Sequence, residues 1–115
     1  MYLVSFYVPE SHLEELTAAL FKKGAGRIGK YDSCAWYTCG TGQFRPLDGS
    51  SPFAGSQDKI ERLPEIKVEM VCESHLVPEI LQELVDKHPY EEPAYHAVEI
   101  LTLGEIKKRA VFDKP

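Results

Sequence analysis

The clearest structural signal in the chain is the run Ile66-Lys67-Val68-Glu69-Met70-Val71-Cys72-Glu73. Apolar or thiol side chains occupy every second position, and most of the positions between them carry a charge. A β-strand directs successive side chains to opposite faces, so this alternation is typical of a strand with one buried face. The run therefore predicts a half-buried strand, with a short strand or a bulged approach just before it at 60–63.

Helical patterns lie on both sides of this strand. After it, apolar residues recur at helical spacing until His88-Pro89, where proline ends the pattern. Before it, Ser11 and Glu14 have the spacing of a capping box, in which each side chain satisfies a free backbone N–H of the first turn. A helix is predicted over 11–23, with Gly24 as the residue that ends it.

Three further strands are predicted, at 2–8, 31–39 and 95–103. The order of all the elements is then βαββαβ in one short chain. This order closes most simply as an α+β, ferredoxin-like sandwich, in which a four-stranded antiparallel sheet carries both helices on one face. The domain is expected over 1–103, followed by a charged tail at 104–115 that includes a short helix at 105–111.

Length and composition exclude several classes of protein. A chain of 115 residues fits one domain, and 13 Lys and Arg against 18 Asp and Glu give a net charge of −5. An acidic chain without a basic run is not expected to bind nucleic acid, because phosphate neutralisation dominates that binding. No run is long enough to span a bilayer and the N-terminus does not have the pattern of a signal peptide. Cys34, Cys39 and Cys72 fit no zinc spacing, so we expect three reduced thiols in a cytoplasmic protein.

The nine residues His88-Pro89-Tyr90-Glu91-Glu92-Pro93-Ala94-Tyr95-His96 form the first candidate site. Each proline fixes its own φ and biases the preceding residue toward an extended conformation, which predicts a stiff corner. One interpretation is structural: His88 caps the helix, the tyrosines pack and the carboxylates are solvated. The other is a divalent metal site that draws its nitrogen and oxygen ligands from His88, Glu91, Glu92 and His96.

The second candidate site is the glycine-, proline- and serine-rich stretch 40–55. Its composition predicts a long irregular loop, which in a compact domain is either functional or disordered. Phe44, Leu47 and Phe53 favour an ordered loop, since they give it apolar anchors. One interpretation is a plain hairpin loop; the other is an anion site in which the N–H groups of Gly40, Thr41 and Gly42 form a concave nest beside Arg45.

A third motif, Gly24-Ala25-Gly26-Arg27-Ile28-Gly29, matches the glycine pattern of dinucleotide-binding proteins. That fingerprint requires a strand before it and a helix after it, and here the predicted order is reversed. The motif is therefore interpreted as a helix cap and a tight connector. Arg27 lies on this connector, where it can contact a ligand or a neighbouring subunit.

Three segments together resemble the YqfO-type insertion domain, which occurs inside the dinuclear-metal family often labelled GTP cyclohydrolase I type 2 homologs: Gly24–Asp32, Gly40–Leu47 and His88–Tyr95. The resemblance covers about residues 1–103. It implies a fold similar to the PII signal proteins and the CutA proteins, which are commonly trimeric. PII-like proteins bind ligands in clefts between subunits near the long loop, so the resemblance favours that location. The family's metal centre lies in flanking domains, so for the insertion module standing alone we expect no hydrolase or cyclohydrolase activity.

These observations predict a non-catalytic, homo-oligomeric binding or sensing module that takes a small anion or metabolite at a cleft between subunits. The alternatives are a divalent metal-binding protein that uses the 88–92 corner, or a regulatory partner of a separate dinuclear-metal enzyme. Expected ligand-binding residues are Gly40, Thr41, Gly42, Gln43, Phe44, Arg45, Arg27, Tyr90 and Tyr95.

Overall fold

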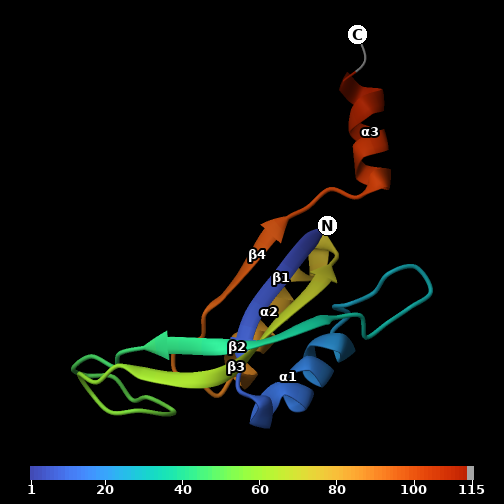
Figure 1. The fold of residues 1–115 in the computed structure, drawn as a ribbon. Coiled ribbons are helices and arrows are strands. Elements are labelled where there is room, and N and C mark those ends of the chain that lie inside the picture. The colour runs from blue at the N-terminus through green and yellow to red at the C-terminus, as the bar shows by residue number, and fades with distance from the viewer. Residues whose placement is uncertain (114–115) are drawn as a thin grey trace.

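A computed structural model describes residues 1–113 of the chain (Figure 1). The elements are β1 (Tyr2–Val8), α1 (Glu10–Lys22), β2 (Trp36–Phe44), β3 (Glu61–Cys72), the 3₁₀ turn η1 (Ser74–Leu76), α2 (Val77–Lys87), β4 (Tyr95–Glu99) and α3 (Leu103–Asp113). The strands form one antiparallel sheet in the order β2-β3-β1-β4. The predicted ferredoxin-like βαββαβ fold is confirmed.

The core lies between α1, α2 and one face of the sheet, as the alternation in β3 predicts. Phe6 of β1 pairs with Val68 of β3, and both side chains are fully buried. The helices contribute further large buried side chains from their apolar stripes: Leu16, Leu20, Ile80 and Leu84. Burial of this apolar face is the main stabilising contribution to the fold.

The predicted start of α1 is wrong by one residue, and this removes the capping box. The helix begins at Glu10 with Pro9 as its N-cap, and no side chain caps it. Ser11 is then inside the first turn, where its hydroxyl lies 2.8 Å from Nδ1 of His12 instead of reaching a free N–H. At the other end Gly24 has a φ of +108°, the left-handed conformation expected after a helix.

The predicted limits of the second strand are also wrong. A strand was expected at 31–39 and a loop from Gly40, whereas β2 runs from Trp36 to Phe44 and pairs with Glu61–Glu69 of β3. Glycine usually weakens a strand, and this misled the sequence interpretation. Of the approach expected at 60–63, residues 61–63 are part of β3 and Ile60 lies just before it. Pro64 is tolerated there because the pairing of β1 with β3 starts only at Ile66, which leaves the second side of Pro64 without a strand.

The C-terminal part also differs in extent. The last strand, β4, ends at Glu99 instead of 103, and the tail helix is longer than the expected 105–111. Figure 1 shows α3 standing away from the sheet. It is joined to the body by a 3.1 Å ion pair between the N-terminal ammonium group and Glu105, and by a 3.4 Å pair between Arg109 and Glu99. Among the helices of residues 1–113, none combines the length and the apolar character needed to cross a bilayer.

Candidate functional site

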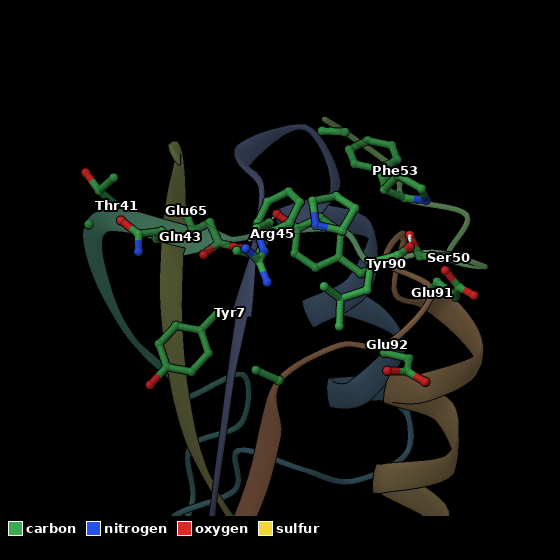
Figure 2. A pocket seen from close by; sticks show the side chains of 18 of the residues that line it. Tyr7, Thr41, Gln43, Arg45, Ser50, Phe53, Glu65, Tyr90, Glu91 and Glu92 are labelled. Carbon is green, nitrogen blue, oxygen red and sulfur yellow. Dashed lines mark hydrogen bonds between the residues drawn. The ribbon is translucent and has the colours of Figure 1, made fainter. Parts of the chain in front are cut away.

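A cavity of about 860 Å³ lies where the β2–β3 hairpin meets the segment that follows α2 (Figure 2). One row of its floor crosses three strands, because Lys67 of β3 pairs with Thr38 of β2 and with Tyr7 of β1. The next row consists of Gly40 and Glu65. Directly paired residues share a sheet face, so these side chains come from the face turned away from the core.

Two segments form the walls of the cavity, and they contact each other. Residues 45–54 provide one wall and Tyr90–Glu92, with Ala94, provide the other. The N–H of Ser51 donates a 2.7 Å hydrogen bond to Glu91. The ring of Phe53 lies 5.8 Å from that of Tyr90 and 5.6 Å, edge to face, from that of His12. The loop is therefore attached at two points. Of its expected apolar anchors, Phe53 makes these ring contacts although it is half exposed, and Leu47 is exposed instead of packed.

A hydrogen bond between side chains joins the proline-containing corner after α2 (residues 88–96, here called the proline corner) to the floor of the cavity. The hydroxyl of Tyr90 donates to Oε2 of Glu65 over 2.7 Å. Burial raises the pKa of Tyr90 far above its usual value, and the hydrogen bond to Glu65 and the negative charge of that carboxylate raise it further. Tyr90 is therefore a protonated, fixed donor at neutral pH.

His88 connects the proline corner to the backbone of β1. It is the residue after α2, and its side chain is only 7% exposed. Its Nε2 lies 2.6 Å from the carbonyl oxygen of Tyr7, and its Nδ1 accepts the N–H of Tyr90 over 3.0 Å. A neutral imidazole with its proton on Nε2 satisfies both contacts. Burial lowers the pKa of His88, although the hydrogen bond to Tyr7 opposes this change.

The structure brings together many of the predicted site residues. Six consecutive residues of the glycine-rich stretch, Gly40–Arg45, line the cavity together with Tyr90, Glu91 and Glu92. Arg27 lies outside it on the exposed α1–β2 connector, and Tyr95 lies outside it on β4. The two segments that the sequence singled out therefore meet within one chain.

The four candidate metal ligands do not meet in this way. His88 is buried with both ring nitrogens in hydrogen bonds, and Glu91 accepts the N–H of Ser51. His96 is exposed on β4, and Glu92 lines the cavity. Throughout residues 1–113 the structure has no cluster of three or more His, Cys, Asp or Glu side chains that could hold a metal ion. A metal ion at Nδ1 of His88 would have to displace the N–H of Tyr90, and one at Nε2 would have to displace the contact with the carbonyl of Tyr7.

The expected anion nest at Gly40–Gly42 is not formed. These residues belong to β2 and pair with Leu63–Glu65 of β3. In a strand, successive N–H groups point to alternate sides, so they do not converge on one point. The cations that line the cavity are Arg45 and Lys67. Lys67, Glu65 and Tyr7 were missed as site residues, because a strand pattern shows which face a side chain is on but not which other strand lies beside it.

Gly42 couples the glycine-rich strand to the proline corner. A Cβ at this position would overlap the side chain of Glu65, which lies across the glycine and accepts the Tyr90 hydrogen bond. We expect Gly42→Ala and Tyr90→Phe each to destabilise the protein by about 1 kcal/mol, because each removes the same hydrogen bond. Combined, they should destabilise it by about as much as one of them alone, with a coupling of about 1 kcal/mol in a double-mutant cycle measured by urea unfolding.

Gly40→Ala is the matched control for this cycle, because a Cβ at Gly40 meets no atom within 4 Å. Its effect should be independent of the residue at position 90. Additive effects of Gly42→Ala and Tyr90→Phe would show that Glu65 does not connect the two segments.

Fold and site together define a class: a ferredoxin-like α+β module with a cavity at one end of its sheet, enclosed by the β2–β3 loop and the corner after α2. No family model matches the chain. The GTP cyclohydrolase 1 type 2 homolog of Mycobacterium leprae is 47% identical over 89 residues, which are 77% of this chain and 23% of that protein. A Bacillus cereus protein related to NIF3 superposes with a TM-score of 0.76 and 34% identity, over 88% of this chain and 26% of that one.

The chain belongs to this family, the GTP cyclohydrolase 1 type 2 homologs or NIF3/YqfO proteins, as the counterpart of one segment. It spans about a quarter of the length of the curated relatives that it matches. The fold extends beyond the family: CutA1 from Pyrococcus horikoshii superposes with a TM-score of 0.67 at 17% identity, over 98% of this chain and 96% of that one. The expected resemblance to YqfO-type and CutA-like proteins is confirmed.

Proposed function

We propose that the chain is a non-catalytic binding module that takes a small anion or an anionic metabolite in the cavity beside Arg45. The observation that carries the proposal is which charged side chains of the cavity already have a partner in the protein. Within residues 1–113 neither Arg45 nor Lys67 forms a salt bridge, so both cations are free for a ligand. Glu65 and Glu91, in contrast, each accept a hydrogen bond from the protein itself.

The charge balance of the cavity limits the kind of ligand. Asp48 and Glu92 also line it, so carboxylates outnumber the cations. A polyanion would be repelled by these groups, whereas a ligand with one anionic group can be held by directional, charge-assisted hydrogen bonds. A small ligand of low charge therefore fits better than a polyphosphate chain.

Binding is proposed without a chemical step. Burial and the hydrogen bond to Glu65 raise the pKa of Tyr90, which lines the cavity, so its phenolate is disfavoured. Its proton is already donated to Glu65, so it is poorly suited to act as a nucleophile or a base. The arrangement of the site favours recognition over catalysis.

Replacement of Arg45 by glutamine tests the proposal. Loss of a charged hydrogen bond should weaken the binding of inorganic phosphate, acetate or succinate by about tenfold or more. Titration calorimetry with each anion measures this change. Arg62→Gln is the control, because Arg62 is exposed on the same hairpin and does not line the cavity. Equal effects of the two variants, or no binding of any of these anions to the wild-type chain, would contradict the proposal.

Self-association is the second part of the proposal. The sheet face turned away from the helices exposes apolar side chains, among them Trp36, which is 68% exposed, and Val98, which is 51% exposed. Burial of such residues between subunits is a common driving force for assembly. We expect a homo-oligomer in solution, a trimer first of all, by light scattering at several concentrations. A monomer at every concentration would contradict this part and leave the cavity within one chain unaffected.

A further inference from the structure

We infer that the ligand joins its anionic group to a flat, apolar body, and that this body lies on the bare backbone at Gly40. The inference rests on the proposed function and specifies the chemical class of its ligand. It starts from a glycine that the fold itself does not explain. Glycine in the interior of a strand weakens the strand, and it often marks a place where a ligand approaches the backbone closely.

Neither backbone strain nor packing requires glycine at position 40. Five glycines of the described chain have a positive φ, and Gly40 is not among them. A Cβ at Gly40 would meet no atom within 4 Å, whereas one at Gly42 would overlap Glu65. The missing side chain at Gly42 thus makes room for the protein, and the missing side chain at Gly40 leaves open space in the cavity floor.

The surroundings of Gly40 suit a flat body with one anionic end. Figure 2 shows Arg45 in the middle of the lining side chains, between those of Gln43 and Tyr90. Aromatic and proline side chains supply much of the remaining surface: Tyr7, Phe44, Pro46, Pro52 and Phe53. A planar ring can lie against peptide groups and aromatic faces over its whole area, whereas a puckered ring contacts them only in part.

Three probes of nearly equal size separate charge from shape. Benzoate is planar and anionic, cyclohexanecarboxylate is puckered and anionic, and benzamide is planar and neutral. Their dissociation constants are measured by NMR titration of the wild-type chain, with Arg45→Gln, Gly40→Leu and Gly104→Leu as variants. Gly104 is the matched control, because a Cβ there also meets no atom within 4 Å and the residue lies on α3, away from the cavity.

We expect the wild-type chain to bind benzoate about tenfold more tightly than each of the other two probes, which corresponds to about 1.4 kcal/mol of binding free energy. Gly40→Leu should abolish the preference of benzoate over cyclohexanecarboxylate, and Gly104→Leu should leave it unchanged. Equal binding of the two anions, a preference that survives in Gly40→Leu, or a preference that Gly104→Leu also abolishes would overturn the inference. If Arg45→Gln still weakens both anions in those cases, the proposed function stands. If no anion binds, or if Arg45→Gln has no effect, the proposed function fails as well.

Discussion

Replacement of His88 by alanine is expected to lower the free energy of unfolding by about 3 kcal/mol, because it removes a buried ring and two hydrogen bonds together. The carbonyl of Tyr7 and the N–H of Tyr90 would both lose their partner. The ring also packs against that of Tyr90, with 4.7 Å between centroids. Urea unfolding measures the loss, which should be accompanied by a disordered corner at 89–94.

Two further variants show which part of His88 matters. In His88→Asn the side-chain oxygen can still accept the N–H of Tyr90, so about 1 kcal/mol of the loss should be recovered. His96→Ala, on an exposed histidine of β4, should change stability by no more than about 0.5 kcal/mol. If His88→Ala is as mild as His96→Ala, then His88 does not hold the corner.

The pH dependence of stability gives a second measurement on the same residue. The pKa of His88 is lowered in the fold from its ordinary value of 6.5. Between that value and the lowered one, the unfolded chain binds more protons than the folded chain, so the free energy of unfolding falls as the pH falls. Above 6.5 both states are neutral at this residue and its contribution is fully present. His88→Asn should show a smaller decrease with falling pH, since asparagine does not titrate.

Much of the fold follows from local signals in the sequence, whereas the limits of β2 do not. The alternation in Ile66–Cys72 predicts a strand and its buried face, and His88-Pro89 predicts the end of α2; the structure has both features. Gly40 and Gly42 were interpreted as the start of a loop because glycine usually interrupts a strand. They belong to β2 because they pair with Leu63–Glu65 of β3, and the side chain of Glu65 occupies the space beside Gly42. No local pattern in the sequence encodes that contact.

The candidate site was predictable to a similar extent. Two segments with unusual composition, 40–55 and 88–96, were the candidate sites predicted from the sequence, and parts of both line one cavity. The role of individual residues was not predictable in the same way. The sequence left His88 open as a helix cap or a metal ligand, and its position at the end of α2 turns the ring toward the backbone of Tyr7. Lys67 looked like one residue of a polar strand face, and only the register with β1 and β2 places it in the cavity floor.

Gly26→Ala is expected to destabilise the protein by about 2–4 kcal/mol, the sum of an unfavourable backbone conformation and an overpacked site. Gly26 has a φ of +75° and is buried in the connector between α1 and β2. A Cβ there would lie 2.7 Å from the carbonyl oxygen of Cys34 and 2.9 Å from the ring of Phe21. The backbone of Cys34 cannot move away freely, because its N–H donates a 2.8 Å hydrogen bond to Gly26, and Gly26 itself donates one of 2.8 Å to Val71 of β3.

Gly29→Ala separates the two causes, because Gly29 has a φ of +57° and open space where a Cβ would lie. It should lose only the conformational part, about 1 kcal/mol. The difference between the two variants, measured by urea unfolding, therefore reports how tightly the connector packs against β3. A large difference fits a glycine motif that serves the fold, since the glycines follow a helix and precede a strand. If the two variants are equal, close packing at Gly26 is excluded and the positive φ alone accounts for this glycine.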